Sequence, residues 1–357
     1  MTKGPENLVR EEIRALTAYH VAPAEGMVKL DAMENPYRLP AELAARMGER
    51  LADVAVNRYP DPSGAALKAR LRETMRIDPA LDLLLGNGSD EILQIVSLAL
   101  AKPGASVLSL EPSFVMYRLA AVAAGMRYVG LALTPDFTLD ARALQEAIER
   151  ERPVLTWIAY PNNPTGNLFP RDAILEAVRA SPGLVAVDEA YYAFSGGASL
   201  LDEVGRHPNL LLVRTVSKLG LAGLRLGVAI GAREWIHELE KLRMPYNVNV
   251  LSAAAADLLL EHREVFERQT AAIVAERARI EDALDAMPGA RRFPSAANFV
   301  LVRVADAPRA FEALKRRGIL VRTFHGSHPL LAHCLRLTVG TPDENTRMLE
   351  ALAPALA

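Results

Sequence analysis

The sequence contains a single cysteine, Cys334, among its 357 residues. One thiol excludes an internal disulfide framework and any zinc site built from cysteines, and such scarcity fits a reducing compartment. No apolar run approaches the roughly 20 residues that span a bilayer. The first residues, MTKGPENLVREEIRAL, are charged and lack the apolar core of a signal peptide. These absences predict a soluble, cytoplasmic protein without a membrane partner.

The charge balance is nearly even, with 41 basic and 43 acidic residues and a formal net charge of −2. This balance gives no electrostatic reason to expect nucleic acid as a partner. His325, His328 and His333 lie near one another in sequence, but their spacing matches no standard ligand pattern, so we expect no metal. The length allows two domains with a substantial buried core.

Short apolar runs typical of strands alternate with helical spacings from about residue 41 to residue 243. This alternation predicts a mainly parallel sheet with helices on both faces. We expect strands at residues 107–110, 154–160, 184–187, 210–214 and 226–230, and helices at 63–76, 114–124 and 171–179. A long helix at 251–287 precedes expected strands at 298–302, 319–322 and 335–339, which surround a helix at 308–317.

The expected fold is therefore α/β, with a large domain over 41–250 and a smaller α+β domain over 251–357. Pro23, Pro36 and Pro40 interrupt residues 1–40. We expect this N-terminal segment to pack on the smaller domain or on a partner subunit.

Polar motifs follow three of the expected strands. Asn163 lies in the stretch 161–166 (PNNPTG), Asp188 begins Asp-Glu-Ala-Tyr, and Lys218 ends Thr-Val-Ser-Lys. The carboxyl ends of parallel strands form a ligand crevice, so these side chains are predicted to converge. A Gly-Asn-Gly turn at 86–88 opens a helix, which makes either an ordinary helix start or an anion site. It lacks the fingerprints of NAD and P-loop nucleotide sites.

Together, in this order and followed by Gly-Leu-Arg-Leu-Gly at 223–227, the motifs resemble fold-type I pyridoxal-phosphate (PLP) aminotransferases over nearly the whole chain. The resemblance implies that Lys218 holds the cofactor as a Schiff base and shuttles the substrate Cα proton. Asp188 would pair with the pyridine nitrogen. The other implied cofactor contacts are Asn163 and Tyr191 at the ring oxygen, Phe114 on the ring face, and Ser89, Asp90, Thr215 and Arg225 at the phosphate.

Two of these assignments carry qualifications. Phe114 could equally be a core aromatic residue at the start of a helix. The step from Lys218 to Arg225 is one residue shorter than the commonest spacing in the superfamily. We therefore expect the loop between these two residues to turn differently.

Within the superfamily the sequence resembles most the histidinol-phosphate aminotransferases. The matching stretches are residues 29–37, 57–61, 86–91, 298–303, 318–322 and 335–341, with Met33 where asparagine is usual. The resemblance implies transamination of L-histidinol phosphate with 2-oxoglutarate, giving imidazole-acetol phosphate and L-glutamate, in histidine biosynthesis. Arg336 matches the arginine that binds the glutamate carboxylate. Further substrate-binding candidates are Arg322, Tyr19 and Asn35.

Tyr59 matches a tyrosine that reaches the cofactor phosphate of the neighbouring subunit, which implies a homodimer. Two alternatives share most of the motifs: an aromatic-amino-acid aminotransferase and a threonine-phosphate decarboxylase. A third alternative is a non-catalytic sensor related to aminotransferases, as in some transcription regulators. Such proteins carry a separate DNA-binding domain, for which the first ~40 residues are too short and too often interrupted by proline.

Overall fold

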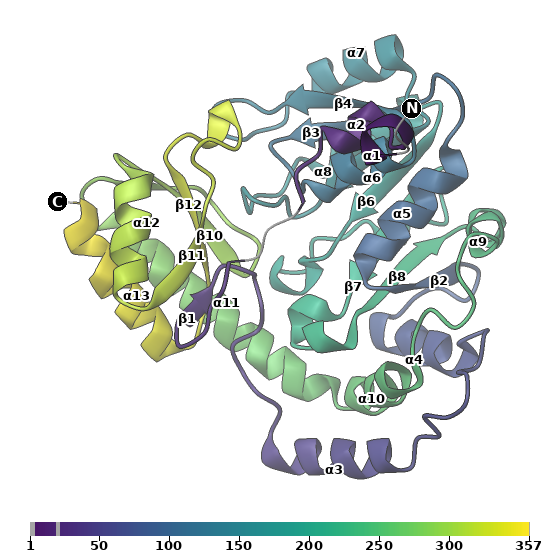
Figure 1. Cartoon of the computed structure of the whole chain (residues 1–357), viewed down its shortest axis with the longest axis horizontal. Helices are drawn as coiled ribbons and strands as arrows, with labels where there is room; N and C mark the ends of the chain where they lie inside the picture. Colours follow the sequence, from purple (N-terminus) through teal and green to yellow (C-terminus); the bar gives the residue numbers. More distant parts are fainter. Residues whose placement is uncertain (1–3, 19–21, 357) are drawn as a thin grey trace.

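The computed structural model describes residues 4–18 and 22–356, which contain two β-sheets (Figure 1). The larger sheet consists of β2 (Asp82–Asn87), β3 (Ser106–Glu111), β4 (Arg127–Ala132), β5 (Leu155–Ala159), β6 (Leu184–Asp188), β7 (Leu210–Thr215) and β8 (Leu226–Gly231). Its strand order is β2-β8-β7-β6-β5-β3-β4. Strands β3 to β7 are parallel, and β8 runs antiparallel to both of its neighbours. The predicted mainly parallel α/β fold is confirmed.

Successive residues of the large sheet face two separate hydrophobic cores, as the pleat of a strand requires. In β2, Leu83 and Leu85 face one core and Leu84 faces the other. The first core also contains residues of α4 (Ala65–Met75), α7 (Ala141–Glu151), α8 (Arg171–Ala180) and α10 (Val250–Glu261). The second contains residues of α5 (Ser89–Leu100), α6 (Met116–Ala123) and α9 (Arg233–Glu240). The sheet is thus buried on both faces, as is usual for a mainly parallel sheet.

The smaller sheet consists of β1 (Val28–Leu30), β9 (Ala290–Arg292), β10 (Phe299–Val304), β11 (Ile319–Thr323) and β12 (Cys334–Thr338). Its order is β1-β11-β12-β10-β9. Strand β1 comes from the N-terminal segment and pairs in parallel with β11. Helices α12 (Ala307–Arg316) and α13 (Pro342–Leu356) share a third core with this sheet.

The N-terminal segment lies on both units. Strand β1 joins the smaller sheet, whereas α1 (Pro5–Leu8) and α2 (Glu11–Arg14) precede it at the large unit. Arg10 lies between these short helices and donates a hydrogen bond from its side chain to the carbonyl oxygen of Ala123, at 2.6 Å. Residues of α2 also lie against α6. The sequence analysis did not anticipate this contact with the large unit.

The predicted single helix at 251–287 is wrong. Helix α10 ends at Glu261, and α11 (Arg263–Asp285) begins after His262, whose φ and ψ of −99° and 40° are not helical. Helix α10 packs against α4 and against α3 (Ala41–Ala52). Phe266 of α11 lies in a core of the large unit, and Ile280 lies in that of the small unit. We infer that the large unit extends beyond residue 250 into the first turns of α11.

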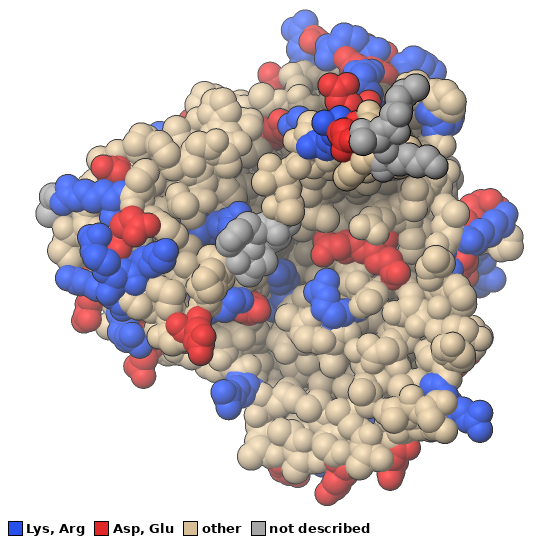
Figure 2. All heavy atoms as spheres, in the orientation of Figure 1, with Lys and Arg blue, Asp and Glu red and all other residues tan. Residues whose placement is uncertain are grey.

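The surface between the two units is hollowed near the centre of the view in Figure 2. Acidic and basic side chains are interspersed over the same face, in keeping with the nearly even charge balance. Within residues 4–18 and 22–356, no helix is both long and apolar enough to cross a membrane.

Candidate active site

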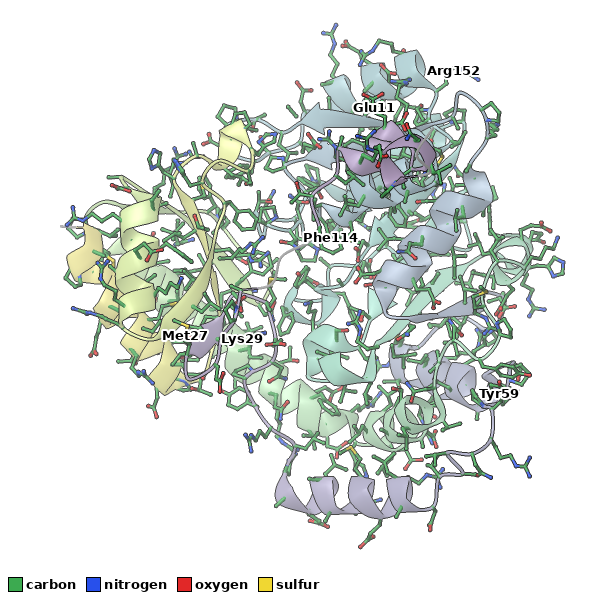
Figure 3. All side chains as sticks on the ribbon, viewed as in Figure 1. Glu11, Met27, Lys29, Tyr59, Phe114 and Arg152 are labelled. Carbon is green, nitrogen blue, oxygen red and sulfur yellow. The ribbon has the colours of Figure 1, made fainter. Side chains whose placement is uncertain are left out.

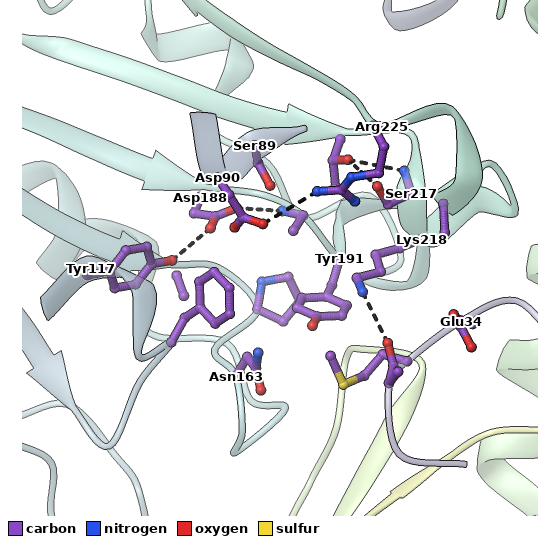
Figure 4. A pocket seen from close by; sticks show the side chains of 18 residues that line it. Glu34, Ser89, Asp90, Tyr117, Asn163, Asp188, Tyr191, Ser217, Lys218 and Arg225 are labelled. Carbon is purple, nitrogen blue, oxygen red and sulfur yellow. Dashed lines mark hydrogen bonds and ion pairs between the residues drawn. The ribbon is translucent and has the colours of Figure 1, made fainter. Parts of the chain in front are cut away.

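The loops after β5, β6 and β7 meet the first turn of α5 around a cavity of about 250 Å³ (Figure 4). The cavity lies at the carboxyl ends of parallel strands, where α/β sheets open onto a crevice. The predicted residues that line it are Ser89, Asp90, Phe114, Asn163, Asp188, Tyr191, Thr215, Lys218 and Arg225. Motifs more than 120 residues apart in sequence therefore share one site.

Lys218 follows β7 in a single 3₁₀ turn, Ser217–Leu219. Its side chain is partly buried, and Nζ donates a hydrogen bond of 3.3 Å to the carbonyl oxygen of Ala32. Burial first, and then the positive charge of Arg336, lowers the pKa of Lys218 to about 8. At pH 7 Lys218 would then be neutral in about one molecule in ten, and the neutral amine is the form that acts as a base or nucleophile.

Asp188 is the last residue of β6 and is buried at the back of the cavity. Its Oδ1 accepts a hydrogen bond from the backbone N–H of Ala190 at 3.0 Å, and Oδ2 accepts one from the Tyr117 hydroxyl at 2.8 Å. Burial raises the pKa of Asp188 to about 6, although both hydrogen bonds act in the opposite direction. The carboxylate is thus placed where a positively charged partner would stabilise it.

The loop that carries Asn163 is fixed by its neighbour Asn162, which is fully buried. Asn162 donates hydrogen bonds to the carbonyl oxygen of Pro112 and to the Thr165 hydroxyl, at 3.0 and 2.7 Å. Asn163 Oδ1 accepts a bond of 2.6 Å from Arg336 of β12. Arg336 also donates to the carbonyl oxygen of Asp31 at 2.7 Å. Arg336 therefore connects the small sheet and the N-terminal segment to the loop after β5.

The first turn of α5 forms a cradle for an anion. Gly88 precedes it with φ 83° and ψ 164°, and no side chain caps the N–H groups that open the helix. A methyl group on Gly88 would lie 2.6 Å from the guanidinium of Arg225, which therefore lies against this turn. Arg225 is also 3.5 Å from the Asp90 carboxylate, so its charge offsets that acid beside the cradle. Arg225 itself follows the 3₁₀ turn Ala222–Leu224 and has φ 51°, in the left-handed region.

Comparison with known proteins assigns this chain to a family. A family model described as aminotransferase class I and II matches residues 25–352. The chain belongs to the class I and II aminotransferases. The resemblance predicted from the motifs is therefore confirmed, and the protein is an enzyme that transfers amino groups.

Several relatives match this aminotransferase over nearly its whole length. The histidinol-phosphate aminotransferase of Chromobacterium violaceum is 55% identical over 347 residues, which are 97% of each chain. That of Methylibium petroleiphilum is 52% identical over 353 residues, covering 98% of this chain and 95% of the relative. The crystal structure of histidinol-phosphate aminotransferase from Sinorhizobium meliloti in complex with pyridoxal-5'-phosphate has a TM-score of 0.87 at 24% identity, covering 97% and 96% of the chains. The aminotransferase thus shares their fold.

Four predicted residues that the structure describes do not line the cavity: Asn35, Tyr59, Arg322 and Arg336. Tyr19 lies outside the described residues. Asn35 is not in the cavity wall, because its amide nitrogen donates to the carbonyl oxygen of Leu219 and to Gln269, at 2.8 and 2.9 Å. It thereby fixes the turn that follows Lys218. Arg322 lies on β11 directly across from Arg336 of β12, and neither residue lines the cavity.

Tyr59 is 80% exposed and stacks on Tyr246, with ring centroids 4.5 Å apart. Figure 3 shows it at the edge of the molecule, well separated from Phe114 in the middle. Among the histidines, the rings of His325 and His333 lie 4.5 Å apart. In the part of the chain that the structure describes, no three His, Cys, Asp or Glu side chains are grouped to hold a metal ion.

Tyr117 and Glu34 are among the cavity-wall residues that were not predicted from the sequence. Tyr117 lies three residues after Phe114, at the start of α6, so it resembles an ordinary core residue until its hydroxyl is seen on Asp188. Glu34 lies at the cavity mouth and forms an ion pair with Lys29 at 2.5 Å. Glu34 lies within residues 29–37, one of the stretches that resemble the family, and this resemblance could have marked it as a site residue.

Proposed function

We propose that this enzyme is a PLP-dependent histidinol-phosphate aminotransferase, which converts L-histidinol phosphate and 2-oxoglutarate into imidazole-acetol phosphate and L-glutamate. The observation that carries the proposal is the convergence of Lys218, Asp188 and the α5 cradle on one cavity, in a chain about half identical to relatives of that name. These relatives do not favour the two alternatives, an aromatic-amino-acid aminotransferase and a threonine-phosphate decarboxylase.

The residues of the cavity fit PLP by their chemistry. The α5 cradle and Arg225 offer N–H donors and positive charge to a phosphate group. Asp188 offers a buried carboxylate to the ring nitrogen, and Phe114 offers aromatic surface to the ring. Lys218 supplies the amine that would attach the cofactor. When bound, PLP supplies an aldehyde that takes up the amino group and a ring that withdraws electrons from the substrate Cα.

The protein's own residues would then handle the proton and the charge. Lys218 Nζ would accept the Cα proton and return it, a role that its lowered pKa of about 8 favours. Asp188, ionised beside the ring nitrogen, would keep that nitrogen protonated. Asn163 and Tyr191 would hydrogen-bond to the ring oxygen, and Thr215 would join Ser89, Asp90 and Arg225 at the phosphate.

Substrate binding would rest mainly on Arg336. A guanidinium can bind either a carboxylate or a phosphate by donating hydrogen bonds from paired N–H groups, and the two half-reactions require both. Arg336 is buried, and its hydrogen bond to Asn163 holds it beside the cavity. We propose Arg322, Tyr19 and Asn35 as further contributors to substrate binding.

We further propose that the enzyme acts as a homodimer in the cytoplasm. Tyr59 and Tyr246 stack on each other at the surface, and Val56 and Met244 are each at least 70% exposed. Exposed apolar patches are typical of contact surfaces between subunits. Tyr59 would then reach the cofactor phosphate of the partner. The near absence of cysteine supports a reducing compartment.

A substrate panel tests the proposal. Purified protein with added PLP is given 2-oxoglutarate and either histidinol phosphate or phenylalanine, and glutamate is measured; threonine phosphate is tested for release of CO₂. We expect the highest kcat/KM with histidinol phosphate. If phenylalanine is used equally well, or if CO₂ is released from threonine phosphate, the substrate assignment is wrong and only the family remains.

A further inference from the structure

Tyr117 occupies a position that couples two walls of the cavity. The side chain is fully buried, and its hydroxyl donates a hydrogen bond of 2.8 Å to Asp188 Oδ2. Its ring stacks on Trp157, with centroids 5.2 Å apart and an angle of 2° between the planes. The ring also packs edge-on against Phe114, with centroids 5.7 Å apart. The Tyr117 ring is therefore fixed by the rings of Trp157 and Phe114, and this sets the direction of its hydroxyl.

The surroundings of Asp188 make this hydrogen bond important. Burial disfavours the ionised carboxylate, and the negative charges of Asp90, on α5, and Glu189, the next residue, raise its pKa further. The opposing contacts are the Tyr117 hydroxyl, from α6, and the backbone N–H of Ala190. The cations Lys218 and Arg225 line the same cavity. A hydrogen bond to a charged group contributes more than a neutral one, so loss of the hydroxyl shifts Asp188 towards its protonated form.

We propose that Tyr117 is a positioning residue that keeps Asp188 ionised and aimed into the cavity, and that PLP affinity depends on its hydroxyl. The inference rests on the proposed function, because Asp188 needs its charge to pair with the ring nitrogen of PLP. Core packing alone would require the ring of Tyr117 and would be indifferent to its hydroxyl.

Tyr117→Phe separates these two roles, because it keeps the ring and removes the hydroxyl. The measurement is the dissociation constant of PLP for the apoprotein, determined from pH 5.5 to 9 by absorbance and fluorescence titration. Loss of a hydrogen bond to a charged group predicts affinity about ten- to a hundredfold weaker near neutral pH. In Tyr117→Phe, Asp188 would ionise only at a higher pH than in the wild type. The pH at which the affinity for PLP rises is therefore also expected to be higher in the variant.

Tyr128→Phe is the matched control. The Tyr128 hydroxyl is also hydrogen-bonded to a carboxylate, that of Glu111, but Tyr128 lies on β4 outside the cavity wall. This variant is expected to bind PLP as the wild type does at every pH. A second test places Tyr117→Phe in an Asp188→Asn background, where removal of the hydroxyl should weaken PLP binding less than about twofold, because no carboxylate is left to ionise.

Replacement of Tyr117 by 3-fluorotyrosine keeps the shape of the side chain but makes its hydroxyl a stronger hydrogen-bond donor, and it tests the inference even if Tyr117→Phe folds poorly. It should move the affinity profile to lower pH. The inference is overturned if Tyr117→Phe binds PLP like the wild type, if the loss is equally large in the Asp188→Asn background, or if fluorination leaves the profile unmoved. A wild-type protein that binds no PLP at all would instead overturn the proposed function.

Discussion

Gly227→Ala should disturb the anion cradle through a single methyl group. Gly227 lies on β8, paired with Gly86 of β2 and Thr215 of β7. A Cβ atom there would lie 2.5 Å from the backbone nitrogen of Ser89 and 2.6 Å from the carbonyl carbon of Gly88. Both are backbone atoms, so no side-chain rotation relieves the clash. The first turn of α5 must move away from β8.

The size of this movement follows from ordinary contact distances. Non-bonded heavy atoms are most stable about 3.5 Å or more apart, so the helix start must shift by about 1 Å. Overpacking of this kind costs about 1–3 kcal/mol of stability. A misplacement of ~1 Å near the reacting groups can reduce activity about a hundredfold. We therefore expect a lower Tm of the apoprotein, weaker binding of PLP, and a large loss of kcat/KM.

The assays are thermal unfolding of the apoprotein, titration with PLP, and transaminase turnover. Gly223→Ala is the control, because a Cβ on Gly223 meets no atom within 4 Å and the residue does not have a positive φ. It should retain wild-type stability and affinity. If Gly227→Ala binds PLP as tightly as Gly223→Ala does, the close approach of β8 to α5 does not shape the phosphate site.

Three further predictions concern other parts of the site. The rate at which the apoprotein binds PLP covalently should rise with pH and level off above about 8, because only neutral Lys218 attacks the cofactor. In Arg336→Met, loss of the nearby positive charge should raise the pKa of Lys218 and move this pH profile to higher pH. An unchanged profile would show that Arg336 does not lower the pKa of Lys218. Arg336→Lys should raise KM for both glutamate and histidinol phosphate at least about tenfold, because lysine lacks the paired N–H donors of arginine. Stopped-flow measurement of each half-reaction checks this, and a half-reaction that is unaffected would show that Arg336 does not bind its substrate. Tyr59→Phe should weaken PLP binding about tenfold without changing the oligomeric state, as checked by titration and sedimentation. Unchanged affinity would remove Tyr59 from the site.

The sequence was most informative where local chemistry dictates local structure. Apolar runs such as 184–187 and 210–214 became β6 and β7, because residues buried on both faces of a parallel sheet must be apolar. The polar residues that end those runs could then be placed at one edge. Asp188 and Lys218 were predicted to converge for this reason, and both line the cavity.

The remainder depended on contacts between distant residues. The end of α10 at His262 was not predicted, because neither glycine nor proline marks it in sequence. The bonds from Arg336 to Asn163 and Asp31 join three segments through their tertiary arrangement. Tyr117 looked like any buried aromatic residue, since its function depends on where one hydroxyl points.

The role of Lys218 is tested most directly by identifying the residue that carries the cofactor. The protein is incubated with PLP, reduced with borohydride, digested, and mapped by mass spectrometry, with Lys218→Ala as the control. We expect a pyridoxyl group on Lys218 and no comparable labelling in the variant. Labelling of another lysine, or equal labelling and full turnover in Lys218→Ala, would contradict this role of Lys218.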